Sequence, residues 1–228
     1  MNWLPADSHG KEDEAMKTFQ TTSLADQVFE KLENDIISGV YARGEILTEL
    51  KLVEQLGVSR TPIREALRRL EQERLIEETG KGSKVLGITE DDLLDIMHIR
   101  EKIEGVAAYY ACLNMTPEGL KELEHIVDLQ DFYLSKTDTD HLRVADDSFH
   151  DVICELSHRT VIRDTLVPLH RKTRRYRKTA IGNKDRAAKS LQEHKAILTA
   201  MQEGNPDKVK EAMDYHISKV KENLLKEK

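Results

Sequence analysis

The stretch LGVSRTPIREALRRLEQERLI, residues 56–76, decides the fold of the N-terminal part of this chain. It follows the short amphipathic run LTELKLVEQL, in which Thr48 suits a helix N-cap, and its own Gly57 suits a helix end. Thr61 and Pro62 are the preferred N-cap and first-turn residues of a second helix. The apolar residues of this second helix share one face: Ile63, Ala66, Leu67 and Leu70. Two helices joined by a tight turn that contains glycine predict a helix-turn-helix unit.

The segments on either side of this unit complete a small domain. Before it, LADQVFEKLENDIISG, residues 24–39, has apolar residues at four-residue spacing and ends in glycine, which predicts a helix. After it, LIEETGKGSKVLGI, residues 75–88, has two apolar ends around a glycine-rich, lysine-bearing tip, which predicts a β-hairpin wing. We therefore predict a winged-helix domain over residues 21–87. Residues 1–20 are polar and unpatterned, and we expect them to form a mobile N-terminal segment.

From Thr89 onward the pattern is helical throughout. Capped beginnings such as TED, TPE and NPD start helices that are separated by a few turn residues. Pro168 lies inside the fourth helix and is expected to kink or split it. Short connections favour antiparallel neighbours, so residues 88–228 are predicted to form an antiparallel bundle of six or seven helices, and the fold class is mainly α. The predicted spans are 89–112, 116–135, 138–157, 159–180, 185–203 and 206–226.

Composition excludes several classes of protein. A chain of 228 residues with 39% hydrophobic and 34% charged residues has the profile of a folded helical protein. The N-terminus lacks a secretory signal, and no apolar stretch approaches the length of a membrane span, so we expect a cytoplasmic protein without membrane association. Cys112 and Cys154 lack metal-binding or redox spacing and are expected to be buried free thiols. The net charge of -7 argues against a non-specific nucleic-acid coat protein but leaves room for a local basic face.

The second helix of the helix-turn-helix unit carries such a face. Arg60, Arg64 and Arg68 follow one another at one-turn spacing, opposite the apolar stripe. Arginine bonds guanine O6 and N7 bidentately or clamps phosphates, and Thr61 can reach a phosphate or a thymine methyl group. The alternative is a solvated face on which Arg64 and Arg68 pair with nearby glutamates. The preceding helix and the following wing favour DNA, because docking in the major groove uses these parts together.

This unit with its glycine-rich hairpin resembles the winged-helix domain of GntR-type bacterial transcription regulators. The helical remainder resembles the FCD-type, FadR-like subgroup, which includes fatty-acid and organic-acid regulators, and the resemblance covers residues 22–226. It implies a homodimer that binds a short palindromic operator in double-stranded DNA and responds to a small effector in the C-terminal domain. It also implies that the base, phosphate and minor-groove contacts come from Arg60, Thr61, Arg64, Gly80 and Lys81.

Two positions depart from the family pattern. Leu50 stands where some members have a contacting arginine, and Arg74 stands where a glycine is usual before the wing. The operator sequence is therefore not transferable from other members.

Three histidines of the helical part lie at the edges of apolar faces. In ADDSFHDVI, residues 145–153, Asp146 and His150 are one helical turn apart. His194 in SLQEHKAIL and His216 in EAMDYHISKV have similar settings. Imidazole and carboxylate ligands suit zinc, nickel, manganese or iron, and helical bundles build such sites from inward-facing side chains. The remaining histidines have the pattern of ordinary core or boundary residues: His9, His98, His125, His141, His158 and His170.

The family resemblance implies a divalent metal site at these positions. Metal-binding members carry an Asp-x-x-x-His pair in one helix and one histidine in each of the last two, a pattern matched by Asp146, His150, His194 and His216. Asp147, three residues before His150, remains a geometric alternative to Asp146.

The effector is expected to be a small carboxylate. Three imidazoles and one carboxylate leave coordination positions open, where such a ligand can bind the ion directly. Arg100 matches a position that points into the ligand cavity of similar proteins and is suited to pair with an anion. The alternative for Arg100 is a surface ion pair with Glu104, one turn away.

These residues leave three functional hypotheses. The leading one is an effector-controlled transcription regulator with a metal in its pocket. A second makes the ion itself the signal. A metalloenzyme is the third, because an open metal position can activate water, but the sequence contains no recognisable general-base motif or nucleophile. We therefore expect no enzymatic activity.

Overall fold

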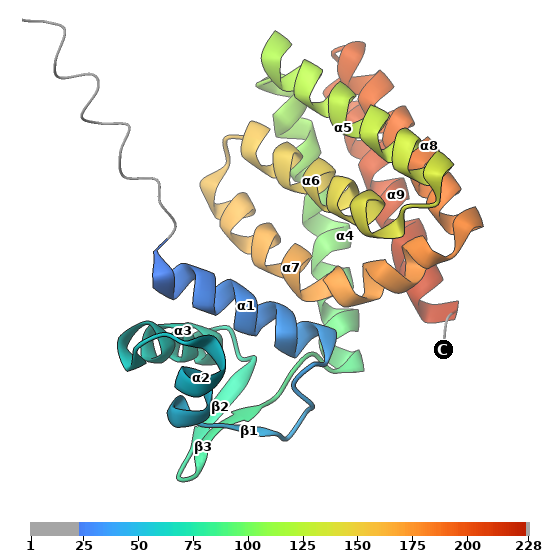
Figure 1. Cartoon of the computed structure of the whole chain (residues 1–228). Helices are drawn as coiled ribbons and strands as arrows, with labels where there is room; N and C mark the ends of the chain where they lie inside the picture. Colours follow the sequence, from blue (N-terminus) through green and yellow to red (C-terminus); the bar gives the residue numbers. More distant parts are fainter. Residues whose placement is uncertain (1–22, 227–228) are drawn as a thin grey trace, which may run out of the picture. The chain divides into compact units, whose positions relative to one another are not determined.

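The computed structural model describes the backbone of residues 23–226, with side chains placed for this range apart from 175–182 and 225–226. The chain divides into two compact units, one ending at Gly87 and the other beginning at Ile88. Both are drawn in Figure 1. Our expectation for residues 1–20 concerns a segment outside the described residues.

The first unit is a winged helix-turn-helix, as predicted. Its strands form an antiparallel sheet in the order β1-β3-β2, and β2 and β3 are the two strands of the wing. The sequence did not predict β1, because a strand of two residues carries no periodic signal. The elements are α1 (Leu24–Ser38), β1 (Ile46–Leu47), α2 (Glu49–Leu56), α3 (Arg60–Gln72), β2 (Ile76–Thr79) and β3 (Gly82–Val85).

The start of α3 differs from the sequence prediction. Thr48 caps α2 and Gly57 ends it in a left-handed conformation, as expected, but Thr61 is not the N-cap of α3. That position belongs to Ser59, whose side chain makes no capping hydrogen bond. Pro62 removes one of the two usual partners, because a cap side chain bonds the N–H of the second or third helical residue and Pro62, the third, has none.

Two backbone positions shape the turns around the wing. Gly82 has φ 127°, and a Cβ there would lie 2.6 Å from the carbonyl oxygen of Leu47, so β1 approaches β3 only because this residue is glycine. Arg74, between α3 and β2, has φ 57°. This left-handed conformation favours glycine, which explains the family's usual residue at this position.

The second unit is a bundle in which the described residues form six helices (Figure 1). Their ends lie within two residues of the predicted spans. Helix α7 runs through Pro168 without a break, so of the expected kink or split, the split is not found. One missing backbone hydrogen bond is not enough to end a helix that packs against α4 and α6. The helices are α4 (Glu90–Leu113), α5 (Pro117–Lys136), α6 (Thr139–Leu156), α7 (Thr160–Gly182), α8 (Lys184–Gln202) and α9 (Pro206–Lys226).

Helix packing in this unit places three histidines in its interior. Helix α4 packs along α9, α8 contacts α5 and α9, and α6 contacts α4, α5 and α7. The histidines of α6, α8 and α9 are flanked in sequence by fully buried apolar residues, so the stripe that forms the core carries them inside. These core residues include Phe149, Ile153, Leu191, Ile197, Met213 and Ile217. None of the described helices is long and apolar enough to cross a membrane.

Candidate functional site

Three imidazoles meet inside the helical bundle. His150 of α6, His194 of α8 and His216 of α9 each offer one nitrogen, and these nitrogens lie within 4.8 Å of one another. The Nε2 atoms of His194 and His216 are 3.3 Å apart. The three residues are at most 2% exposed. The structure thus brings together three of the four residues that the sequence predicted as metal ligands.

Each imidazole turns its other nitrogen, Nδ1, toward an oxygen on a different helix. A carboxylate or amide oxygen accepts hydrogen bonds, so in the neutral form of each ring Nδ1 is the donor and Nε2 keeps its lone pair. Metal-binding imidazoles are oriented in the same way by partners behind them. The three pairs are His150 with Glu104 Oε2 at 2.9 Å, His194 with Gln130 Oε1 at 2.8 Å, and His216 with Glu193 Oε2 at 2.7 Å.

This arrangement fits a bound cation. When both rings are neutral, the Nε2 lone pairs of His194 and His216 face each other in the protein interior, with the two nitrogens 3.3 Å apart. Such lone pairs repel unless a positive ion lies between them. Neutral imidazole is also the ligand type that zinc, nickel, manganese and iron share.

The fourth predicted ligand lies beside the imidazoles. Asp146 is 9% exposed, and its Oδ1 is 3.9 Å from Nε2 of His194. Asp147, the alternative, lies against arginines, with its Oδ2 3.2 Å from Nη1 of Arg143 and 3.6 Å from Nε of Arg174. Asp146 is therefore the carboxylate within closer reach of the imidazoles.

Arg100 lies in the interior and is already paired. Its Nε donates to Oε1 of Glu104, and its Nη1 lies 3.3 Å from Oγ1 of Thr173 on α7. The Arg100 and Glu104 side chains are 1% and 3% exposed. The ion pair with Glu104 that we considered for Arg100 is present, but it lies in the interior and not at the surface. One-turn spacing on α4 brings Arg100 and Glu104 together, whereas the burial of this pair depends on α7, which packs over α4.

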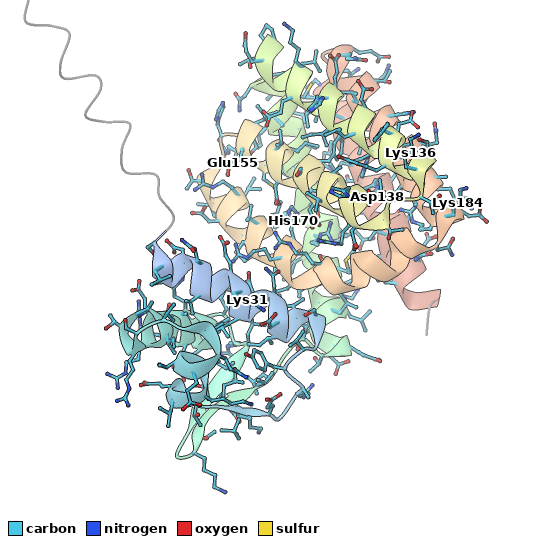
Figure 2. The ribbon with its side chains drawn as sticks, in the orientation of Figure 1. Lys31, Lys136, Asp138, Glu155, His170 and Lys184 are labelled. Carbon is cyan, nitrogen blue, oxygen red and sulfur yellow. The ribbon has the colours of Figure 1, made fainter. Side chains whose placement is uncertain are left out.

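His170 contacts the same cluster, although we predicted it to be an ordinary core or boundary residue. It is 2% exposed, and its position on α7 is labelled in Figure 2. Its Nε2 lies 3.3 Å from Oε1 of Glu104, and its Nδ1 lies 2.8 Å from Oδ1 of Asp151. The available signal was its four-residue spacing from Leu166, which is fully buried.

The carboxylates behind the imidazoles are held in their charged form. Burial alone raises the pKa of Glu104, but Arg100 and the imidazoles of His150 and His170 lower that pKa well below its usual value. Burial also raises the pKa of Glu193, and the hydrogen bonds from His216 and from Arg186 lower it in net. Both groups therefore act as acceptors toward the imidazoles.

The predicted DNA-contacting residues form an exposed surface on the first unit. Arg60, Thr61, Arg64 and Arg68 are exposed on α3, and Gly80 and Lys81 are exposed at the tip of the β2–β3 hairpin. Arg64 is 63% exposed, and its Nε donates to Oε1 of Glu49 on α2 at 2.7 Å. The glutamate pairing considered for Arg64 is thus present, on a side chain that remains accessible.

Two family models match the chain in separate parts. The model described as bacterial regulatory proteins, gntR family, matches residues 24–85, and the FCD domain model matches residues 95–219. The Uxu operon regulator of Haemophilus influenzae is 30% identical over 216 residues, covering 85% of this chain and 79% of that protein. The gluconate operon transcriptional repressor of Bacillus licheniformis is 32% identical over 123 residues, covering 54% of this chain and 51% of that protein.

The fold also matches a solved structure. The Escherichia coli protein McbR/YncC has a TM-score of 0.77 at 23% identity, covering 91% of this chain and 99% of its own. The matched families and relatives are transcription regulators, not enzymes. The chain therefore belongs to the GntR family of bacterial transcription regulators, in the group that carries a C-terminal FCD domain.

Proposed function

We propose that this regulator binds a palindromic operator as a homodimer in the cytoplasm. We propose also that a small carboxylate effector in a metal-containing pocket controls its affinity for DNA. The observation that carries the proposal is the convergence of three buried imidazoles, each oriented by an acceptor behind it, inside the effector domain of a DNA-binding family.

On the DNA side, α3 lies in the major groove and the hairpin tip approaches the minor groove. Arg60, Thr61, Arg64 and Arg68 make the base and phosphate contacts, while Gly80 and Lys81 form the wing tip. Their exposure and charge support these roles. Footprinting on the protein's own promoter region at low salt tests this part, because absence of a protected palindrome would contradict it. Light scattering of the free protein and of the complex tests the homodimer.

On the effector side, Asp146, His150, His194 and His216 hold one divalent ion, which can be zinc, nickel, manganese or iron. When bound, the ion supplies an open coordination position that anchors a carboxylate. The name of the gluconate operon repressor makes D-gluconate, a hydroxy acid, the first effector to test. Arg100 contributes positive charge to this anion and shares its guanidinium with Glu104.

Operator binding measured under three conditions separates this role of the ion from a sensor role. The conditions are metal-free protein, protein with metal, and protein with metal and D-gluconate or related sugar acids. An anchoring ion requires the organic acid before DNA affinity changes, whereas a sensor changes DNA affinity with metal alone. Elemental analysis of protein purified without chelator identifies the ion.

A further inference from the structure

We propose that Glu104 is a positioning residue that links Arg100 to the metal ligand His150, so that an anion bound at Arg100 changes how tightly the metal is held. This inference rests on the metal centre proposed above. It assigns to one buried carboxylate a coupling role between the effector and the ion.

Glu104 connects three groups from three helices. Its Oε1 accepts from Nε of Arg100 on the same helix and lies 3.3 Å from Nε2 of His170 on α7. Its Oε2 accepts from Nδ1 of His150 on α6 at 2.9 Å. The side chain is 3% exposed, so the surroundings screen these interactions far less than water does.

The other two partners of the imidazoles lack this link. Gln130, behind His194, is neutral, and its amide nitrogen donates to the carbonyl oxygen of Ala145 at 3.1 Å. Glu193, behind His216, is bound by both terminal nitrogens of Arg186 at 2.8 Å. Arg186 lies at the beginning of α8, on a different helix from Arg100. Of the three partners, Glu104 is thus the one that contacts the arginine predicted to bind the effector.

The direction of the coupling follows from charge. The Arg100 guanidinium draws negative charge toward Oε1 and away from the hydrogen bond that Oε2 accepts from His150. An anion bound to the Arg100 guanidinium competes with Glu104 for its positive charge. Glu104 then becomes a stronger hydrogen-bond acceptor for His150, and the imidazole becomes a better metal ligand. By linkage, an anion that tightens the metal is itself bound more tightly when the metal is present.

A double-mutant cycle on the full-length protein tests the coupling without a known effector. Zinc affinity is measured calorimetrically for wild type, Arg100→Met, Glu104→Gln and the double variant. Glu104→Gln weakens zinc binding by about 10–100-fold. Arg100→Met strengthens it, both because a nearby positive charge is lost and because Glu104 is released. In the Glu104→Gln background the effect of the lost positive charge persists, but the effect through Glu104 disappears. The gain in zinc affinity from Arg100→Met therefore differs by at least about threefold between the two backgrounds.

Two control variants separate coupling from general charge effects. Glu101→Gln removes a carboxylate of the same helix that pairs with Lys221 at 2.9 Å, and it leaves zinc affinity unchanged. Glu193→Gln weakens zinc binding but preserves the full gain from Arg100→Met. Should Arg100→Met fail to fold because it strands the Glu104 charge, the polar but uncharged Arg100→Gln replaces it in the same cycle. Should Glu104→Gln fail to fold, Glu104→Asp replaces it, because its shorter side chain draws the carboxylate away from His150 and keeps the charge.

The outcomes distinguish this inference from the proposal beneath it. Equal gains from Arg100→Met in both backgrounds overturn the coupling role of Glu104 and leave the metal centre intact. Wild-type protein that binds no zinc, nickel, manganese or iron overturns the metal centre and the coupling together. A gain that depends on Glu104 supports both.

Discussion

At the scale of single residues, the candidate metal centre shows how tightly one side chain can be fixed. The ring of His194 stacks on Phe149 with 4.2 Å between centroids, while its Nδ1 is bonded to Gln130. Its Nε2 lies 3.3 Å from that of His216. With one face stacked and Nδ1 bonded, the ring cannot turn away without breaking a contact. The ring is therefore already oriented for metal binding before an ion arrives.

Replacing this ring tests the site directly. His194→Ala removes one of three nitrogen ligands, and we expect metal affinity to fall by more than about 100-fold, beyond the loss typical of partners behind a ligand. Calorimetric titration of the chelator-treated protein with zinc measures the change. His125→Ala, at an exposed histidine of α5, is the matched control and should bind like wild type. Retention of one tightly held ion by His194→Ala would place the site elsewhere.

The Arg64 side chain offers a second test, on the DNA surface. Arg64→Ala should weaken operator binding by about 1–3 kcal/mol if the guanidinium contacts a base. Glu49→Gln should bind DNA at least as well as wild type, because it removes the carboxylate that holds Arg64 and also repels phosphate. Gel-shift titration at fixed salt measures both. Lys136→Ala on α5 serves as a control for lost charge, and an equal loss there would refute a specific contact.

Both cysteines are predicted to be unreactive in the folded protein. Burial raises the pKa of Cys112, and burial together with the nearby carboxylates of Glu104 and Asp151 raises that of Cys154. Because the thiolate is the reactive form, iodoacetamide at neutral pH should label neither residue until denaturant is added. Mass spectrometry of the treated protein gives the number of labelled cysteines. Rapid labelling of native protein would show that the bundle opens on that timescale.

At the scale of secondary-structure elements, the wing depends on a glycine in its sheet. Gly82→Ala would place a methyl group 2.6 Å from the Leu47 carbonyl at φ 127°. We expect it to destabilise the first unit by about 1–3 kcal/mol, the usual cost of such a backbone conformation. Chemical unfolding measures the difference. Gly80→Ala, which meets nothing within 4 Å, is the matched control and should change stability little.

Elements and burial were predictable from the sequence to different degrees. Helix ends follow local chemistry, as at Thr89, whose capping box with Asp92 begins α4. The two-residue β1 and the displaced start of α3 escaped prediction because each depends on one or two residues. The inward position of Arg100 depends on how α7 packs over α4, and no helical spacing contains that information.

At the scale of the whole molecule, the proposed metal centre and the proposed DNA-binding surface belong to separate compact units. The three histidines come from α6, α8 and α9 and their partners from α4, α5 and α8, so an ion bound to them would tie together most of the second unit. Each unit has its own buried core. The first is built on residues such as Leu32, Ile63 and Leu70.

Metal removal should therefore act on one unit alone. We expect calorimetry to resolve two unfolding transitions and chelation to lower only that of the helical unit. A ligand present at about 100 times its dissociation constant stabilises a fold by about 2.7 kcal/mol, and chelation removes that contribution. Added zinc should restore the transition, with His194→Ala protein as the unresponsive control. Equal shifts of both transitions would mean that the units unfold together.

Burial of the imidazoles also sets the speed of metal exchange. With at most 2% of each histidine exposed, an ion enters or leaves only when the bundle opens locally, so its residence time is governed by that opening. An ion bound during synthesis is then exchanged slowly, whereas a chelator-treated chain takes up zinc through the same openings. Protein produced in nickel-rich and zinc-rich media should differ in metal content long after transfer to a common buffer, preserving a record of the conditions of its synthesis.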